Sequence, residues 1–513
     1  MVEYKRMNLE RVLYMRTSGI LMHISSLPSE YGIGTMGKEA YKFIDFLHRS
    51  NQSLWQILPV CPTSYGDSPY QSFSTYAGNP YFIDFDMLKE EGLLKKSEYN
   101  KIDWGSNPEY VDYEKIYNNR YTVLKKAYKR FKDTDKSDFY KFLDKNERWI
   151  SNYALFMSIK DEHNGKCWLE WEDSLKHRNS HSLWLFKESH QDEIEFWEFV
   201  QFKFYEQWHT LKEYAHKNGV KIIGDIPIYV ALDSADVWVS PDLFELDDDL
   251  VPITVAGCPP DDFSEDGQIW GNPLYAWQRH KETDYGWWTD RIRLATELYD
   301  IVRIDHFRGF DEFYSIPYGD TTARNGKWVK GPGMELFDKL SEKLGDLPII
   351  AEDLGFMTDS VKKLLKDSKF PGMKVLEFAF YPDSDSEYLP HNFDKNCVAY
   401  IGTHDNPPIK EWLSETDKKS VDFAKEYMGF TLKSENDFVW ALTRLLLSSS
   451  ADTAIMLIQD CLELGSESRM NTPSTALGNW QWRMKPDALT KNLEKKLATL
   501  TKLYGRYNPK GSN

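Results

Sequence analysis

The sequence predicts an α/β protein built on a (β/α)8 TIM barrel, with helical and irregular subdomains inserted into it. Two observations predict this fold class. Eight short apolar segments are separated by longer stretches with helical spacing, as expected for a parallel sheet with crossover helices. Several of these segments end in charged side chains, and barrel enzymes carry their active sites at the carboxyl ends of the strands.

The apolar segments are the expected barrel strands. The first is expected over 19–25, and the helix after it, over 37–50, places Ala40, Phe43, Ile44 and Leu47 on one face. A terminal helix is expected over 491–505. The other strands are expected, in order, at 54–60, 220–230, 301–307, 347–355, 373–380, 396–406 and 453–460.

Three intervals are too long to be simple crossovers. Residues 61–218 lie between the second and third strands, contain charged helical stretches, and are expected to form an inserted subdomain region. Residues 228–285 are expected to form a long ordered loop region, in which we interpret 257–272 as an active-site flap. Residues 407–447 are expected to form a helical excursion after the seventh strand. With these insertions, residues 1–513 are interpreted as a single catalytic barrel.

The composition is that of an ordinary globular protein, with 41% hydrophobic and 28% charged residues and a formal net charge of -17. Binding to a phosphate backbone or an anionic membrane needs a positive footprint, so we expect neither nucleic acid nor membrane as a partner. No apolar run reaches the roughly 18 residues of a membrane span, and the N-terminus lacks the apolar core of a signal peptide. The five cysteines are scattered without a CxxC spacing, which is typical of a reducing compartment and predicts a cytoplasmic protein.

The segment 301–310, IVRIDHFRGF, carries charges where a buried strand should carry aliphatic side chains. Because side chains alternate across a strand, Arg303 and Asp305 share one face, and Val302 and Ile304 share the other. The aliphatic face suits the helix-covered outside of a barrel, so Arg303 and Asp305 are expected to point toward the barrel axis. A neighbouring guanidinium lowers the pKa of a carboxyl, so we expect Asp305 to stay ionised, as a nucleophile requires.

Two further strands end in carboxyl groups at the same rim. Glu352 shares a face with Ile350 and has no arginine beside it, so we expect its pKa to be raised and its proton to be available. Asp405 follows His404 at the end of the seventh strand. One ionised and one protonated carboxyl are what the cleavage of a glycosidic bond requires. The convergence of Asp305, Glu352 and Asp405 therefore indicates a site that acts on glycosides.

Other uses of these residues are weighed against this one. The acids could serve only as salt-bridge and helix-capping groups, and His306 and His404 could join them as metal ligands. The sequence has no HExxH or His-x-His spacing, so we expect no metal. It also lacks a glycine-rich phosphate loop and a G-x-S-x-G motif, which argues against nucleotide cofactors and serine-based catalysis. No cofactor is expected.

A set of longer motifs extends from about residue 17 to 484 and occurs in the order found in one enzyme family. With them, the chain resembles the 4-α-glucanotransferases called amylomaltase or disproportionating enzyme, in glycoside hydrolase family 77. The resemblance implies a retaining α-glucan enzyme on a barrel with inserted subdomains. The motifs are SSLPSEYGIGTMG (25–37), DSPYQSFSTYAGNPYFID (67–84), GDIPIYVALDSADVW (224–238), AGCPPDDFSEDGQIWGNPLY (256–275), VRIDHFRGF, AEDLG, GTHDN and LGSESRMNTPSTALGNWQWR (464–483).

The resemblance implies a role for each candidate residue. Asp305 would be the nucleophile and Glu352 the general acid/base, while Asp405 would bind sugar hydroxyls and stabilise the transition state. Trp270 would lie in the flap over the acceptor side, and Asn479, with Trp480, would belong to the C-terminal wall. The other implied substrate contacts are Arg303, His306 and His404 in the donor subsite, Asp225 on the third strand, and Ser68, Tyr70 and Gln71 of the SPYQ loop.

The chain departs from the usual family pattern at a few positions. Ser474 stands where glycine is usual, Asp262 where an aromatic residue is common, and Pro407 and Pro408 where Asp-Thr often follows. None of them belongs to the three acids, so they bear on the shape of the rims and on chain-length preference.

The implied reaction transfers a segment of a 1,4-α-D-glucan to the 4-hydroxyl of an acceptor by a retaining double displacement. Its partners would be maltooligosaccharides, amylose or other α-1,4-glucans, with glucose as an acceptor. Two alternatives stay open: an α-glucan hydrolase of the α-amylase type that uses the same acids, and a non-catalytic glucan-binding protein. The spacing of the acids does not decide between transfer and hydrolysis, and the sequence does not give the oligomeric state.

Overall fold

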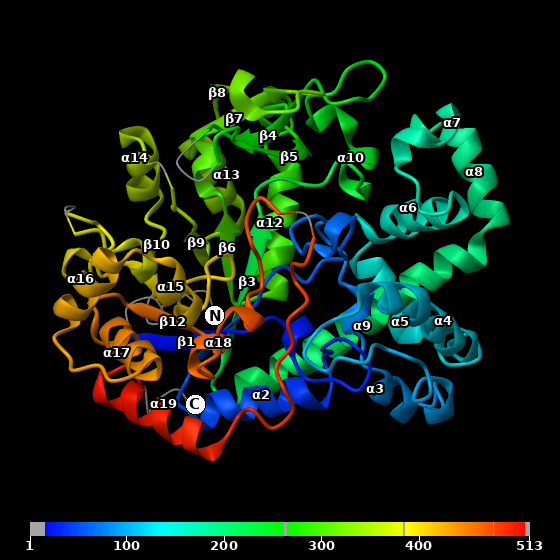
Figure 1. The fold of residues 1–513 in the computed structure, drawn as a ribbon. Helices are drawn as coiled ribbons and strands as arrows, with labels where there is room; N and C mark the ends of the chain where they lie inside the picture. Colours follow the sequence, from blue (N-terminus) through cyan, green and yellow to red (C-terminus); the bar gives the residue numbers. More distant parts are fainter. Residues whose placement is uncertain (1–15, 261–263, 356, 383–384, 476, 508–513) are drawn as a thin grey trace.

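The computed structural model describes residues 16–507, except 261–263, 356, 383–384 and 476. The expected barrel strands are present as one parallel eight-stranded sheet with the order β10-β11-β12-β1-β2-β3-β6-β9 (Figure 1). The Ala351 N–H donates to the Pro371 carbonyl at 3.0 Å, which joins β9 to the residue before β10 and closes the barrel. The strands are β1 (Thr17–Leu21), β2 (Leu54–Gln56), β3 (Lys221–Pro227), β6 (Ile301–Asp305), β9 (Ile349–Ala351), β10 (Gly372–Val375), β11 (Cys397–Tyr400) and β12 (Thr453–Leu457).

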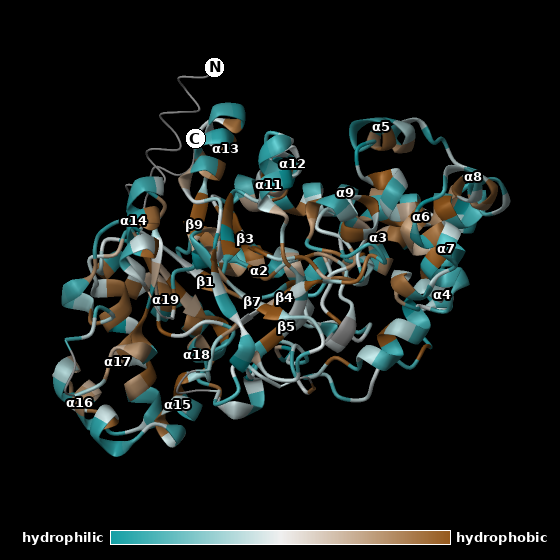
Figure 2. Cartoon of the chain, turned by 90° about the horizontal axis from the view of Figure 1, so that it is seen from above, coloured by the Kyte–Doolittle hydropathy of each residue, from teal (hydrophilic) through white to brown (hydrophobic). Residues whose placement is uncertain are grey.

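Amphipathic helices surround the barrel. Helix α2 (Lys38–Arg49) buries Ala40, Phe43, Ile44 and Leu47, as its sequence spacing predicts. In Figure 2 the central strands β3 and β9 are brown, whereas outlying helices such as α13 and α14 are mostly teal. The barrel helices after β3 are α12 (Gly286–Leu298), α13 (Met334–Leu344), α14 (Asp359–Ser368), α17 (Glu435–Ser448), α18 (Ile458–Cys461) and α19 (Lys491–Leu503).

A helical lobe lies beside the barrel between β2 and β3, on the right of Figure 1. Its longest helix, α9 (Gln191–Lys217), returns to the barrel and buries two glutamines against the segment 78–84. Gln201 Oε1 accepts the Gly78 N–H at 2.7 Å, and Gln201 Nε2 donates to the Gly78 carbonyl at 2.9 Å. The side chain thus makes the two backbone hydrogen bonds that a neighbouring strand would make. The other helices of the lobe are α3 (Phe85–Glu90), α4 (Tyr113–Phe131), α5 (Ser137–Lys145), α6 (Ile150–Glu162), α7 (Asp173–Lys176) and α8 (Ser180–Ser189).

A second, antiparallel sheet lies above the barrel in Figure 1, with the order β5-β4-β7-β8. Its strands are β4 (Thr254–Cys258), β5 (Gln268–Pro273), β7 (Glu312–Pro317) and β8 (Lys327–Lys330). The region 228–285, expected as a long loop, therefore contains two strands as well as helices α10 (Ala235–Val239) and α11 (Trp277–Glu282). Part of the expected flap over 257–272 is β5, and Asp262 lies outside the described residues.

Helices α15 (Ile409–Glu415) and α16 (Lys418–Met428) follow β11, and α17 completes this helical stretch before β12. Within the part of the chain that the structure describes, no helix is both long and apolar enough to cross a membrane. The carboxyl ends of β3, β6, β9 and β11 lead directly into the segments that carry the candidate site residues.

Candidate active site

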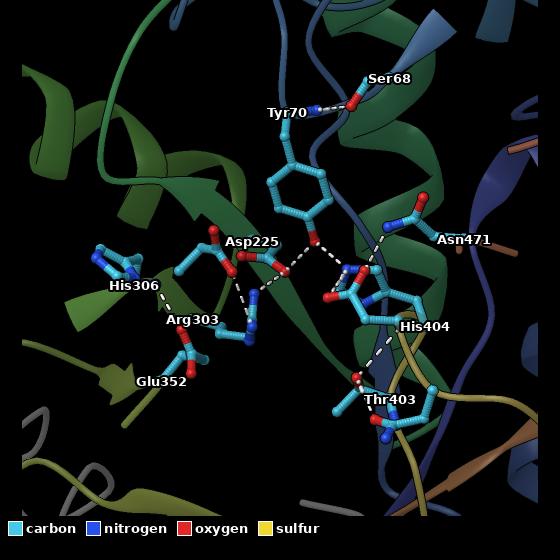
Figure 3. A network of polar contacts seen from close by, with 12 residues as sticks. Ser68, Tyr70, Asp225, Arg303, His306, Glu352, Thr403, His404 and Asn471 are labelled. Atoms are coloured by element: carbon cyan, nitrogen blue, oxygen red, sulfur yellow. Dashed lines mark hydrogen bonds and ion pairs between the residues drawn. The ribbon is translucent and has the colours of Figure 1, made fainter. Parts of the chain in front are cut away.

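Arg303 lies at the centre of a charged cluster inside the barrel (Figure 3). It is 3% exposed, and the adjacent strand β3 places the fully buried Asp225 directly opposite it. One guanidinium nitrogen is 2.6 Å from Asp225 Oδ2 and another is 3.0 Å from Asp305 Oδ1. The strand alternation predicted from the sequence is therefore correct, but the single cation serves two carboxylates.

Glu352 lies next to Asp305 on the neighbouring strand. The register pairs Ile304 of β6 with Ala351 of β9, so Asp305 and Glu352 occupy the next position on parallel strands spaced about 4.8 Å apart. Backbone N–H groups hold both carboxyl oxygens of Glu352: that of His306 donates to Oε2, and that of Leu354 donates to Oε1, each at 2.7 Å. His306 has the left-handed backbone angles φ 54° and ψ 49° at this turn. Glu352 is thus fixed beside Asp305 by the backbone.

The two carboxyls titrate as a pair. Burial raises the pKa of Asp305 to about 8; the Arg303 charge opposes this rise, and the charges of Glu352, Asp225 and Asp405 add to it. Burial also raises the pKa of Glu352, as expected, against the effects of Arg303 and the two backbone N–H groups. The expectation that Arg303 leaves Asp305 with a lowered pKa is wrong, because burial and the neighbouring carboxyl groups outweigh the effect of the guanidinium. The pair therefore keeps a proton at neutral pH.

Tyr70 and His404 connect this pair to Asp405. The Tyr70 hydroxyl donates to Asp225 Oδ2 at 2.9 Å and lies 2.9 Å from His404 Nε2, while the two rings stack with centroids 5.3 Å apart. His404 Nε2 is 3.3 Å from Asp405 Oδ2, and Asn471 Nδ2 donates to Asp405 Oδ1 at 2.6 Å. Burial lowers the pKa of His404, so this ring is neutral where it meets Asp405.

The opposite side of the site is formed by His306 and Trp270. Their rings meet edge to face with centroids 4.9 Å apart, and Gln71 Nε2 donates to the Trp270 carbonyl at 3.4 Å and to Asn272 Oδ1 at 3.2 Å. Burial lowers the pKa of His306 to about 3. Its Nε2 is buried and has no hydrogen-bond partner among the described residues. A neutral imidazole with a vacant nitrogen suits a sugar hydroxyl.

Two of the expected substrate contacts, Ser68 and Asn479, also make hydrogen bonds within their own loops. Ser68 Oγ accepts the Tyr70 N–H at 3.2 Å and so fixes the start of the SPYQ loop. Asn479 Oδ1 accepts the Thr472 N–H at 2.9 Å, and its Nδ2 donates to the Thr475 carbonyl at 2.9 Å. In this structure the Asn479 side chain is engaged within its own loop.

The sequence analysis missed Asn471 and Asn272. Asn471 lies within the RMN stretch of the last long motif, but its partner Asp405 is 66 residues earlier in the chain. Asn272 donates to the Val230 carbonyl at 2.8 Å and accepts from Gln71, which links β5 to the end of β3. Among the described residues, no group of three or more His, Cys, Asp or Glu side chains is arranged to hold a metal ion.

Comparison with known proteins gives concordant results. The sequence model of a family described as 4-alpha-glucanotransferase matches residues 22–490. A 4-alpha-glucanotransferase of Clostridium butyricum is 50% identical over 94% of this chain and 100% of its own length. The corresponding protein of Aquifex aeolicus is 46% identical over 96% of this chain and 100% of its own. A solved amylomaltase from Streptococcus agalactiae in complex with acarbose has a TM-score of 0.94 at 45% identity, covering 96% of this chain and 100% of its own.

Proposed function

The chain belongs to the 4-alpha-glucanotransferase family, glycoside hydrolase family 77, and on that premise we propose how its residues carry out the transfer. Asp305 is the nucleophile, Glu352 the general acid/base and Asp405 the residue that binds sugar hydroxyls in the transition state. The observation that carries this assignment is the position of Asp305 and Glu352 side by side at the carboxyl ends of β6 and β9. Retaining enzymes need this pairing of a nucleophile with a proton donor.

The first half-reaction cleaves the donor glucan. The Asp305 carboxylate attacks the anomeric carbon, the bond to the glycosidic oxygen breaks, and that oxygen takes the Glu352 proton. The fragment with the reducing end leaves, and a glucosyl ester remains on Asp305. Glu352 is now a carboxylate, held by the N–H groups of His306 and Leu354, which stabilise its charge.

The second half-reaction forms the new glycosidic bond. Glu352 takes the proton of the acceptor 4-hydroxyl as its oxygen attacks the anomeric carbon, and the ester bond breaks to return the electron pair to Asp305. Two inversions restore the original configuration. The two catalytic carboxyls should lie about 5–5.5 Å apart when a donor sugar is bound, as retention requires.

Transfer requires that a sugar reach the ester before water does. Trp270, on β5, presents a ring beside His306 at the open side of the site. We assign this ring to the acceptor sugar, whose C–H face packs against the indole and displaces water. His306 Nε2, which has no partner within the described part of the chain, is available for a hydroxyl of a sugar bound there.

Maltooligosaccharides, amylose and other α-1,4-glucans are the proposed donors, and glucose is the simplest acceptor. The net charge of -17 supports a neutral substrate over a phosphorylated one. The scattered cysteines support a cytoplasmic location. We also keep the division of the single catalytic barrel into an insertion over 61–218, a region over 228–285 and helices over 407–447 as an interpretation, supported by the helices and strands within these ranges.

Incubation with maltotriose tests this function. The expected products are glucose and a ladder of longer maltooligosaccharides, with a constant number of reducing ends. A steady increase in reducing ends would support the hydrolase instead, and bound but unchanged maltotriose would support the binding protein. Asp305→Asn should lower kcat by at least about 10⁴-fold while glucan binding persists. Asp346→Asn, at an exposed position before β9, is the matched control and should leave turnover unchanged.

A further inference from the structure

The turn that carries His404 and Asp405 packs on a buried carboxyl, Glu377. Glu377 follows β10 and is 6% exposed. A Cβ added at Gly402 would lie 2.5 Å from Glu377 Oε1, so the carboxyl packs directly against the backbone of the turn. The same added Cβ would lie 3.0 Å from Asn406 Cβ, and Asn406 Oδ1 accepts the N–H and the hydroxyl of Thr403, each at 2.9 Å. Glu377 is therefore connected to the turn that carries His404 and Asp405.

Around Glu377 there are more carboxyl groups than cationic side chains to pair with them. Asp460 of α18 and Glu411 of α15 face it, together with the guanidinium of Arg469, which is itself 3.0 Å from Glu411. Glu377 Oε1 and Asp460 Oδ2 are buried, and within the described residues neither has a hydrogen-bond partner. Three carboxylates facing one guanidinium would leave buried charge unpaired, which is far more costly than binding a proton.

The pKa shifts in this cluster also identify Glu377 as the protonated carboxyl. Burial raises the pKa of Glu377 well above its ordinary value, and the charges of Asp460 and Glu411 raise it further, against Asn406 and Arg469. Burial raises the pKa of Asp460 to about 7, against its hydrogen bond from the Ile409 N–H. Glu377 is thus the carboxyl of this cluster that keeps its proton at neutral pH.

We propose that Glu377 is a positioning residue that remains uncharged and holds the turn of His404 and Asp405 in place against the donor sugar. It acts through Gly402 and Asn406 and touches no reacting atom. The proposal rests on the proposed function, because Asp405 must contact the sugar for its position to affect turnover. A neutral carboxyl also supplies an O–H donor to a region lined by acceptor oxygens.

The pH dependence of stability tests the charge state of Glu377. An unfolded carboxyl ionises near about 4.3, but the folded Glu377 keeps its proton, so the parent protein loses stability as pH rises above that value. Glutamine has no such dependence. The Tm of Glu377→Gln relative to the parent should therefore rise between pH 5 and 9, by at least about 2 °C.

Glu98→Gln is the matched control for this measurement. The hydrogen bonds from Arg130 lower the pKa of Glu98 to about 2, so its contribution is complete above pH 5 and the relative Tm of the variant should not change with pH from there to 9. A relative Tm of Glu377→Gln that stays level or falls with pH would show an ionised Glu377 and overturn the proposal.

Turnover tests the positioning role. Glu377→Met keeps the length of the side chain but removes its carboxyl group, and should lower kcat about 30-fold with a smaller change in KM, since small misplacements of catalytic groups have effects of this size. The conservative Glu377→Gln should restore kcat to within about threefold of the parent. If Glu377→Met fails to fold, Gly402→Ala, which crowds Glu377 Oε1, replaces it with the same expected loss.

The failures of the two proposals can be told apart. An Asp405→Asn enzyme with full kcat would refute the role of Asp405. The charge state of Glu377 would still be decided by the Tm measurement. An inactive Asp405→Asn enzyme together with full kcat in both Glu377→Met and Gly402→Ala would refute only the positioning role.

Discussion

The protonation of the Asp305–Glu352 pair depends on residues that lie far apart in the sequence. Asp225 occupies one side of the Arg303 guanidinium at 2.6 Å, so only part of its charge acts on Asp305. Backbone N–H groups stabilise the carboxylate form of Glu352 in the resting enzyme. The proton therefore belongs to the pair, and its loss leaves Glu352 with no proton to give to the leaving oxygen.

We expect kcat/KM for maltotriose to fall on the alkaline side. Burial raises the pKa of Asp305 to about 8, and above the higher apparent pKa of the pair no proton remains for the leaving oxygen. The slope should approach tenfold per pH unit. A rate profile between pH 5 and 10, with stability checked at each pH, measures this. A profile that stays level to pH 10 would contradict the shared proton.

Asn471→Leu should lower kcat by about 10- to 100-fold without unfolding the enzyme. The Asn471 amide holds Asp405 Oδ1 at 2.6 Å, and Leu leaves that carboxylate free to turn away from the sugar. Steady-state kinetics on maltotriose, with circular dichroism as the test of folding, measure the effect. Asn118→Leu, at an exposed amide on α4, is the control and should match the parent. A similar loss of kcat in both variants would contradict the assignment of Asn471 to holding Asp405.

The sequence predicts the positions of the acids but not their environment. Asp305, Glu352 and Asp405 could be found because each ends or follows a strand, and parallel strand ends meet at one rim. The pairing of Arg303 with Asp225 joins residues 78 positions apart, and that of Asn471 with Asp405 joins residues 66 apart. Such contacts form only in the closed barrel and do not show in the local periodicity of the sequence. The sequence therefore does not predict the direction of the Asp305 pKa shift.

At the scale of elements, the parallel strands were easier to predict than the antiparallel ones. The barrel strands are buried on both faces and read as continuous apolar runs. Strands β4 and β5 are partly exposed and pair with a register shift between Val255 and Gly257. Their sheet is completed by β7 and β8, which come after β6 in the chain. Only the tertiary fold brings these strands together.

Gln201→Leu should lower the free energy of unfolding by about 2–4 kcal/mol. The amide of Gln201 satisfies both the N–H and the carbonyl of Gly78, and Leu leaves the two groups buried without that partner. Denaturant unfolding followed by tryptophan fluorescence measures the change. Gln278→Leu, on the exposed face of α11, is the control and should stay within about 0.5 kcal/mol of the parent. Equal stabilities of the two variants would rule out this anchoring of α9.

At the scale of the whole molecule, the protein carries a large net charge and its substrate carries none. The chain carries a formal charge of -17, while a glucan is neutral. The electrostatic field of the protein therefore keeps it soluble without attracting or repelling the substrate. Of the proposed catalytic acids, Glu352 is buried, and Asp305 and Asp405 are partly exposed at the barrel mouth. Dissolved salt screens partly buried charges less than charges on the open surface.

The KM for maltotriose should accordingly change by less than about twofold between roughly 20 and 500 mM NaCl. Initial rates of glucose release at each salt concentration, with sodium sulfate as a second salt, give this measurement. A KM that changes steeply with salt would show that screened charges of the protein affect glucan binding and would contradict this prediction.

The position of Arg303 has a consequence for the full catalytic cycle. When the ester forms, the negative charge disappears from Asp305 and reappears on Glu352, and the guanidinium acts on both of them. The total charge around Arg303 is therefore the same before and after the first half-reaction. The first half-reaction thus requires no counter-ion to enter or leave the site, and the cation is as well balanced in the glucosyl-enzyme as in the resting enzyme.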